Sequence, residues 1–148
     1  MARAGYTLVC VSNQPGAAKG RVTVERLQAV HERVLVLLAR EGVELSASRL
    51  CLHHNEASLP ELGGPCDCRK PAPGMLKDAA GALGLDLTAS WMVGDTDADV
   101  AAGRAAGCRT VLIEYPGGAH KRSGGARPDL LAADLADGVA QLLDHEDR

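Results

Sequence analysis

Residues 90–114, SWMVGDTDADVAAGRAAGCRTVLIE, decide the fold class. Ser90–Gly94 is a short apolar run that favours a buried strand, and residues 97–106 have a helical pattern that ends at Gly107. Residues 109–114 are again β-prone. A strand, a helix and a second strand in so short a stretch are typical of parallel strands joined by a crossover helix. The stretch therefore predicts an α/β protein.

The same alternation continues toward both ends of the chain. Upstream, β-prone runs at residues 6–11 and 49–52 flank a helix with Thr23 as N-cap and Gly42 just beyond its end. Two further helices are predicted to begin at Pro73-Gly74 and after Asp134, the second with Leu135 on its buried side. A glycine-rich exposed loop is predicted at residues 117–128. We predict a Rossmann-like parallel sheet with helices on both faces, in a single domain spanning residues 1–148 without a separate cap domain.

Composition narrows the class of protein. The 148 residues are 46% hydrophobic, enough for a core, while the net charge of −3 and the 2% aromatic content argue against nucleic-acid binding. The longest strongly apolar run, Val34–Ala39, is too short to span a bilayer, and the first dozen residues do not form a signal peptide. Of the five cysteines, three have metal-site spacing, which suits a reducing compartment. We expect a cytoplasmic monomer that binds neither a membrane nor nucleic acid.

Two short segments bring three thiols and one imidazole together in a zinc loop at residues 51–68: Cys51, His53, Cys66 and Cys68. Thiolate and imidazole ligands at this spacing can close a tetrahedron around Zn²⁺, and four protein ligands leave no open position for catalysis. The predicted zinc is therefore structural, and it would pin a loop that aims Arg69 and Lys70. The alternative is three chance cysteines beside a surface histidine.

Polar residues follow the predicted strands at their carboxyl ends, where ligands collect in parallel sheets. Ser12 and Asn13 follow the first strand and offer hydroxyl and amide groups to phosphate oxygens. Asp95 follows a later strand and offers oxygen to Mg²⁺, and Lys70 at a helix entrance offers a compact positive charge to a phosphoryl group. The alternatives are an ordinary turn at Ser12 and a solvated surface lysine at position 70.

The residues around Asp95 allow more than one interpretation. Asp97 favours a helix N-cap, because carboxylates are common at helix starts. Asp99 is a candidate to orient either Lys70 or a metal-bound water. We therefore give Asp95 alone the role of magnesium ligand.

Together these motifs resemble the haloacid dehalogenase superfamily of phosphatases. The resemblance rests on Val11-Ser12-Asn13-Gln14, on the zinc loop running through Arg-Lys-Pro to Met75, and on Met92-Val93-Gly94-Asp95 with Asp99. It covers residues from about Tyr6 to Leu143. Within the superfamily, the sequence is most similar to the group of heptose-bisphosphate phosphatases and histidinol phosphatases.

The resemblance implies hydrolysis of a phosphate monoester of a small phosphorylated sugar or metabolite. It favours the 7-phosphate of D-glycero-D-manno-heptose 1,7-bisphosphate, with histidinol phosphate as the alternative substrate. Catalytic Mg²⁺ on Asp95 and structural Zn²⁺ are the implied cofactors. The implied site residues are Ser12, Lys70 and Asp95 for catalysis and Ser12, Asn13, Arg69 and Lys70 for substrate binding.

One departure from the family pattern is large. The family's first motif is an Asp-x-Asp whose first aspartate is the nucleophile, and no such motif precedes Tyr6. We therefore expect that the domain is truncated at its N-terminus and lacks its first central strand. We also expect that the 148-residue polypeptide has no phosphatase activity. A non-catalytic, zinc-stabilised remnant and a half-domain completed by another chain are the alternatives.

Overall fold

The computed structural model describes residues 1–146 of the chain. The chain divides into two compact units, Met1–Arg69 and Lys70–Arg148, and each unit is described by itself. The expected single domain of residues 1–148 stays a prediction.

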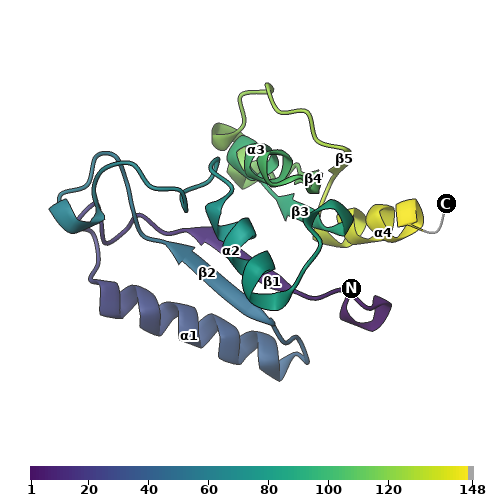
Figure 1. Ribbon diagram of the computed structural model, residues 1–148, viewed down its shortest axis with the longest axis horizontal. Helices are drawn as coiled ribbons and strands as arrows, with labels where there is room; N and C mark the ends of the chain where they lie inside the picture. The colour runs from purple at the N-terminus through teal and green to yellow at the C-terminus, as the bar shows by residue number, and fades with distance from the viewer. Residues whose placement is uncertain (147–148) are drawn as a thin grey trace. The chain divides into compact units, whose positions relative to one another are not determined.

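The first unit contains a parallel pair of strands, β1 (Val9–Asn13) and β2 (Ala47–Cys51), joined by helix α1 (Val24–Arg40) (Figure 1). Asn13 pairs with Cys51, and the backbone N–H of Gln14 donates to the carbonyl of Cys51 at 2.8 Å. Both strands therefore end at the same edge, which places the loop after β1 beside the start of the zinc loop. Short 3₁₀ turns lie at Ala2–Ala4 and Pro60–Leu62.

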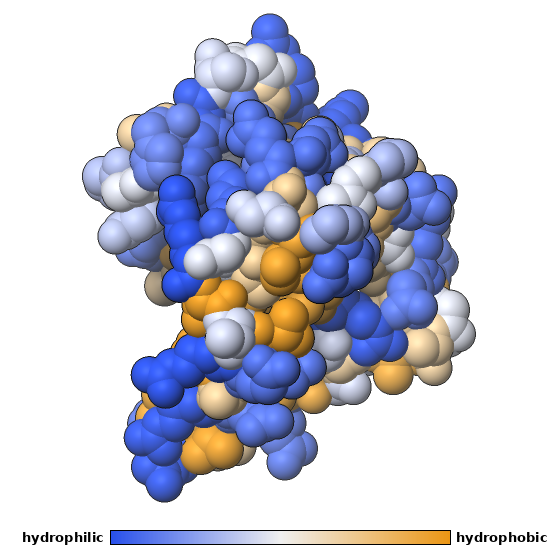
Figure 2. Space-filling model, turned by 90° about the vertical axis from the view of Figure 1, so that its left-hand side faces the viewer, coloured by the Kyte–Doolittle hydropathy of each residue, from blue (hydrophilic) through white to orange (hydrophobic). Residues whose placement is uncertain are grey.

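Helix α1 has the predicted ends but a poorly covered surface. The Thr23 side chain accepts from the backbone N–H of Arg26 at 3.2 Å, and Gly42 takes a positive φ of 74° beyond the helix, as expected. None of its residues is buried, and Val30 remains 53% exposed. Figure 2 shows that hydrophobic residues reach an otherwise largely hydrophilic surface.

The second unit contains a three-stranded parallel sheet in the order β3-β4-β5. Its strands and helices are α2 (Gly74–Leu83), β3 (Trp91–Gly94), α3 (Asp97–Ala106), β4 (Arg109–Ile113), β5 (Leu130–Ala132) and α4 (Leu135–Glu146). Helix α3 packs on β3 and β4, whereas α4 packs on β4 and β5 (Figure 1). Val100, Val111 and Leu142 are almost fully buried between these layers.

The second unit differs from the sequence predictions at three points. Strand β5 was not predicted, because its three residues are too few to give a periodic pattern. Leu135, expected inside the last helix, is 62% exposed. The N-cap of α3 is Thr96 rather than Asp97, which stands at the first helical position.

The α/β class and the parallel strands are confirmed. Within residues 1–146, the pair β1-β2 and the sheet β3-β4-β5 share no ladder of hydrogen bonds. In the same residues, no helix combines the length and the apolar character needed to cross a bilayer.

Candidate active site and metal cluster

The four residues of the predicted zinc loop lie together. The ligand atoms of Cys51, His53, Cys66 and Cys68 are all within 4.8 Å of one another. Cys51 is the last residue of β2 and is fully buried, so a regular strand fixes one corner of the cluster. The loop after β2 supplies the other three ligands, and the turn at Pro60–Leu62 returns the chain toward Cys51.

The distances in the cluster fit a tetrahedral zinc site. Zn–S bonds of about 2.3 Å at tetrahedral angles place two sulfurs about 3.8 Å apart, and a sulfur and a nitrogen about 3.6 Å apart. The Sγ atoms of Cys51 and Cys66 are 3.8 Å apart, and those of Cys66 and Cys68 are 3.4 Å apart. Nδ1 of His53 lies 3.5 Å from Sγ of Cys68 and 4.0 Å from Sγ of Cys51. The donor set therefore suits Zn²⁺, with His53 binding through Nδ1.

One pair of thiols is closer than a zinc site allows. The Sγ atoms of Cys51 and Cys68 are 2.8 Å apart, so this pair must separate by about 1 Å to share a tetrahedral ion. Burial raises the pKa of both thiols, and the hydrogen bonds that the Cys68 thiol donates to Cys51 and Cys66 raise the pKa of Cys68 further.

The cluster also fixes the position of Arg69. Nη1 of Arg69 donates to the carbonyl of His53 at 3.1 Å, so the guanidinium is tied to the backbone between the two halves of the zinc loop. Burial acts to raise the pKa of Cys66, but the backbone N–H of Arg69 is the first of several donors that lower this pKa overall. The zinc loop and Arg69 are therefore one hydrogen-bonded assembly.

Ser12 and Asn13 occupy the last two positions of β1. Oγ of Ser12 accepts from Nε2 of Gln14 at 2.9 Å, which leaves the Ser12 hydroxyl able to donate its own proton. The pairing of Asn13 with Cys51 places this hydroxyl at the same strand end as the metal cluster. The structure thus brings the β1 residues and the zinc loop to one edge of the first unit.

Lys70 forms a buried ion pair with Asp99. Nζ of Lys70 and Oδ1 of Asp99 are 2.7 Å apart, and their side chains are only 11% and 7% exposed. Of the two roles considered for Asp99, the structure shows the contact with Lys70, and the interpretation of Lys70 as a solvated surface lysine is wrong. The pair holds the ammonium group at a fixed place beside the start of α3.

Two features of α3 hold Asp99 in place. Its Oδ2 accepts from the backbone N–H of Thr96 at 3.0 Å and from the Thr96 hydroxyl at 2.7 Å, and the Thr96 hydroxyl accepts from the N–H of Asp99, forming a capping box. Residue 94 must be glycine here, because a Cβ at that position would lie 2.4 Å from the side chain of Asp99.

Asp95 follows the last residue of β3 and lies in the turn that leads into α3. Its backbone carbonyl accepts from Nη1 of Arg122 at 3.2 Å. Within residues 1–146, its carboxylate takes part in no hydrogen bond or ion pair, whereas those of Asp97 and Asp99 are both engaged. An uncommitted carboxylate at a strand end is a suitable oxygen ligand for Mg²⁺, so the residue present fits the expected ion.

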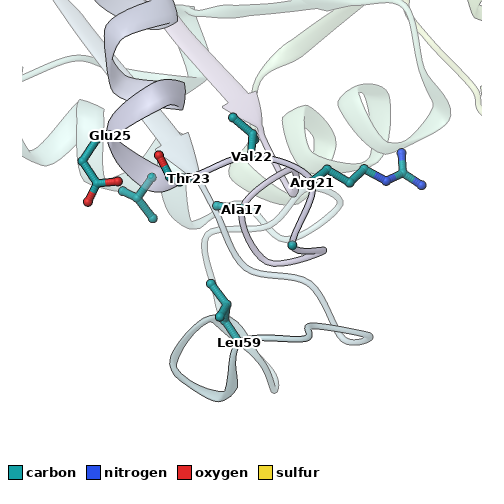
Figure 3. A pocket seen from close by; sticks show the side chains of 8 residues that line it. Ala17, Arg21, Val22, Thr23, Glu25 and Leu59 are labelled. Carbon is teal, nitrogen blue, oxygen red and sulfur yellow. The ribbon is translucent and has the colours of Figure 1, made fainter.

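A cavity lies at the start of α1. It has a volume of about 500 Å³ and its lining includes Ala17, Arg21, Glu25 and Leu59 (Figure 3). Figure 3 shows the Arg21 and Glu25 side chains extending to opposite sides. None of the predicted site residues lines it.

The sequence interpretation missed a connection between the Asp95 turn and the loop after β4. Asp97 accepts two hydrogen bonds from Ser123, and Arg122 donates to the backbone of Asp95. No periodicity or motif links residues 26 positions apart in this way. The only signal available in the sequence was a basic, glycine-rich loop of no assigned function.

Comparison with known proteins defines the class of protein to which the chain belongs. Residues 67–138 match the HAD-hydrolase-like family. A solved structure, the D,D-heptose 1,7-bisphosphate phosphatase from B. bronchiseptica complexed with magnesium and phosphate, superposes with a TM-score of 0.81 and 33% identity. The alignment covers 97% of this chain and 78% of that one. The fold and the match are those of a haloacid dehalogenase-like hydrolase.

Similar proteins of curated function narrow this class to one group of phosphatases. A D-glycero-β-D-manno-heptose-1,7-bisphosphate 7-phosphatase from Yersinia pestis is 39% identical over 133 residues, which cover 90% of this chain and 71% of the relative. The enzyme of that name from Pseudomonas aeruginosa is 39% identical over 114 residues, covering 77% of this chain and 60% of the relative. The chain belongs to the haloacid dehalogenase-like phosphatase family that contains these heptose-bisphosphate phosphatases.

Proposed function

We propose that this chain carries the phosphate-binding and metal-binding residues for hydrolysis of the 7-phosphate of D-glycero-D-manno-heptose 1,7-bisphosphate. The observation that carries the proposal is the similarity to enzymes of that name, which extends over 90% of the chain in the Yersinia pestis relative. The buried Lys70–Asp99 pair and the cysteine–histidine cluster support it, because the pair fixes a positive charge in place and the four ligand atoms of the cluster lie within 4.8 Å of one another.

Each proposed site residue has a separate task. Lys70 balances negative charge on the phosphoryl oxygens, and Asp99 keeps its ammonium group oriented. Ser12 donates a hydrogen bond from its hydroxyl to a phosphoryl oxygen, and Asn13 contributes a further polar contact. Arg69 contacts the substrate beyond the reacting phosphate, from the position that its bond to His53 fixes.

Asp95 is the proposed ligand for Mg²⁺. When bound, the ion would supply positive charge that stabilises the oxygens of the transferring phosphoryl group. The Bordetella enzyme, a structural neighbour, was solved with magnesium and phosphate, which supports this choice of ion. The chain holds the carboxylate of Asp95 directly after β3. Within residues 1–146, this carboxylate accepts no hydrogen bond.

Cys51, His53, Cys66 and Cys68 are the proposed ligands of one structural Zn²⁺. The ion would fix the loop that carries Arg69, because the His53 carbonyl that holds this side chain lies between ligands. Free thiols in close proximity also support a cytoplasmic location, where cysteines stay reduced. We propose that the protein is a monomer that binds a small phosphorylated sugar and binds neither nucleic acid nor a membrane.

The printed sequence does not supply the aspartate nucleophile that the resemblance implies. Asp-x-Asp spacing occurs at Asp95–Asp97 and at Asp97–Asp99, in the turn and first residues of α3, where Asp97 and Asp99 are already engaged by Ser123 and Lys70. We propose that the 148-residue polypeptide by itself has no phosphatase turnover. A zinc-stabilised, non-catalytic remnant is the second candidate function, and the missing nucleophile motif is the observation that favours it.

Two measurements test the proposal in order. The reading frame upstream of Met1 is determined first, since an in-frame strand ending in Asp-x-Asp supports the enzyme and a stop codon supports the remnant. Phosphate release from heptose 1,7-bisphosphate and from histidinol phosphate is then measured on the extended product and on the 148-residue polypeptide. We expect the extended product to prefer the heptose bisphosphate. A preference for histidinol phosphate would overturn the substrate assignment, and turnover of the shorter polypeptide that is lost in Asp95→Asn would overturn its predicted inactivity.

A further inference from the structure

The loop between β4 and β5, residues 114–129, folds back onto the turn that carries Asp95. Its first part is a 3₁₀ turn at Pro116–Lys121, and Arg122 and Ser123 follow directly. We call residues 114–129 the β4–β5 loop. Most of this loop is exposed, but Gly118 is buried, which shows that one point of the loop is in close contact with the body of the unit.

Asp97 and Ser123 form one connection between the loop and α3. Oδ2 of Asp97 accepts from both the backbone N–H and the hydroxyl of Ser123, each at 2.6 Å. The hydrogen bonds from Ser123, side chain first and backbone second, lower the pKa of Asp97, so the carboxylate is charged at neutral pH. Asp97 is not needed as an N-cap, because Thr96 and Asp99 cap α3 together. Its side chain is therefore committed to the loop.

Arg122 and Gly118 form two further connections, and both reach Asp95. The guanidinium of Arg122 donates to the carbonyl of Asp95 at 3.2 Å and to the carbonyl of Tyr115 at 3.0 Å. The guanidinium thus joins the start of the loop to the turn after β3. At Gly118, a Cβ would lie only 2.7 Å from Oδ2 of Asp95 and 3.2 Å from Nη1 of Arg122. The loop backbone therefore lies directly against the Asp95 carboxylate.

We propose that Asp97 is a positioning residue that fastens the β4–β5 loop, through Ser123, so that Gly118 and Arg122 hold the Asp95 turn in place for its cation. The inference rests on the proposed function in one respect, the assignment of Mg²⁺ to Asp95. Asp97 does not bind the cation in this account. It restrains the loop whose backbone limits where the Asp95 carboxylate can lie, and the adjacent guanidinium offsets part of the negative charge of the turn.

Limited proteolysis measures this restraint directly, because trypsin cleaves after Lys121 and Arg122 within the loop, whereas Pro128 blocks cleavage after Arg127. In Asp97→Ala, which removes the acceptor of two hydrogen bonds, we expect cleavage in the loop to be faster by on the order of tenfold. Asp97→Asn keeps an oxygen acceptor for Ser123 and should restore most of the protection. The matched control is Asp137→Ala, since Asp137 is also an acidic residue in the first turn of a helix, α4, but bonds to Ala133 instead of the loop.

The affinity for Mg²⁺ measures how this restraint affects Asp95. Titration of the 148-residue polypeptide with Mg²⁺, followed by calorimetry, should give several-fold weaker binding in Asp97→Ala than in Asp97→Asn or Asp137→Ala. Urea unfolding of each variant verifies that the comparison is made between folded proteins. Asp95→Asn should abolish cation binding while leaving the loop as resistant to trypsin as in the wild type.

The outcomes separate this inference from the proposed function. Equal cleavage rates in Asp97→Ala and the wild type, or failure of Asp97→Asn to restore protection, would overturn the fastening role. Loss of cation binding in Asp97→Asn with the loop still protected would overturn it as well, because Asp97 would then be a ligand. Cation binding that is unchanged in Asp95→Asn would contradict the magnesium assignment in the proposed function, whereas the trypsin result would still decide the role of Asp97.

Discussion

Removal of the charge on Asp99 should strongly destabilise the second unit. Lys70 and Asp99 are 2.7 Å apart, with side chains 11% and 7% exposed, so neither charge can be rehydrated without local opening. Loss of one partner of a buried ion pair typically costs about 3–5 kcal/mol of unfolding free energy. We expect about 3 kcal/mol for Asp99→Asn, near the lower limit, because the asparagine can still accept from Thr96.

The assay is a double-mutant cycle in urea, followed by the fluorescence of Trp91, the only tryptophan in the sequence and the first residue of β3. Lys70→Met supplies the second single variant, and the combined Asp99→Asn/Lys70→Met protein carries neither charge. We expect the double variant to be markedly more stable than the sum of the two single losses predicts, because no unpaired charge is left buried. Strictly additive losses, or a loss below about 1 kcal/mol in Asp99→Asn, would refute a buried ion pair that orients Lys70.

Three other changes test separate parts of the structure. Metal analysis should find about one zinc per chain in the wild type and much less in Cys68→Ser; a metal-free wild type would contradict the cluster assignment. Burial acts to raise the pKa of Asp129, but the hydrogen bonds from Thr110 lower it overall, so Asp129 stabilises the fold above its unfolded-state pKa of about 4 and this contribution is lost as the pH falls further. Acid unfolding should therefore be less steep in Asp129→Asn, and an unchanged profile would count against this role. Arg109→Ala removes a guanidinium 4.4 Å from the Trp91 ring centroid and should cost about 1 kcal/mol with a shift in Trp91 emission, whereas unaltered emission would argue against the contact.

The sequence predicted the elements that local chemistry determines. Helix α3 spans Asp97–Ala106. Thr96 caps its first turn, and Gly107 ends it with a positive φ of 90°. Thr23 was predicted as an N-cap for the same kind of reason, because its side chain bonds only three residues along the chain. The ligand spacing of the zinc loop likewise brought its four members together within 4.8 Å, as expected.

The remaining features depend on contacts between distant segments. The bond between Asp97 and Ser123 spans 26 positions, and nothing local distinguishes this aspartate from an ordinary N-cap. Strand β5 is formed by Leu130–Ala132 because β4 offers an edge to pair with, which three residues do not reveal by themselves. For Asp99 the sequence left open a contact with Lys70 or with a metal-bound water, and only the fold shows that Lys70 and Asp99 form a buried pair.

The most direct test of the phosphate site is a crystal of this chain soaked with Mg²⁺ and inorganic phosphate. The account predicts one anion within hydrogen-bonding distance of Nζ of Lys70, with the cation on the carboxylate of Asp95. A phosphate bound far from these two residues would contradict it.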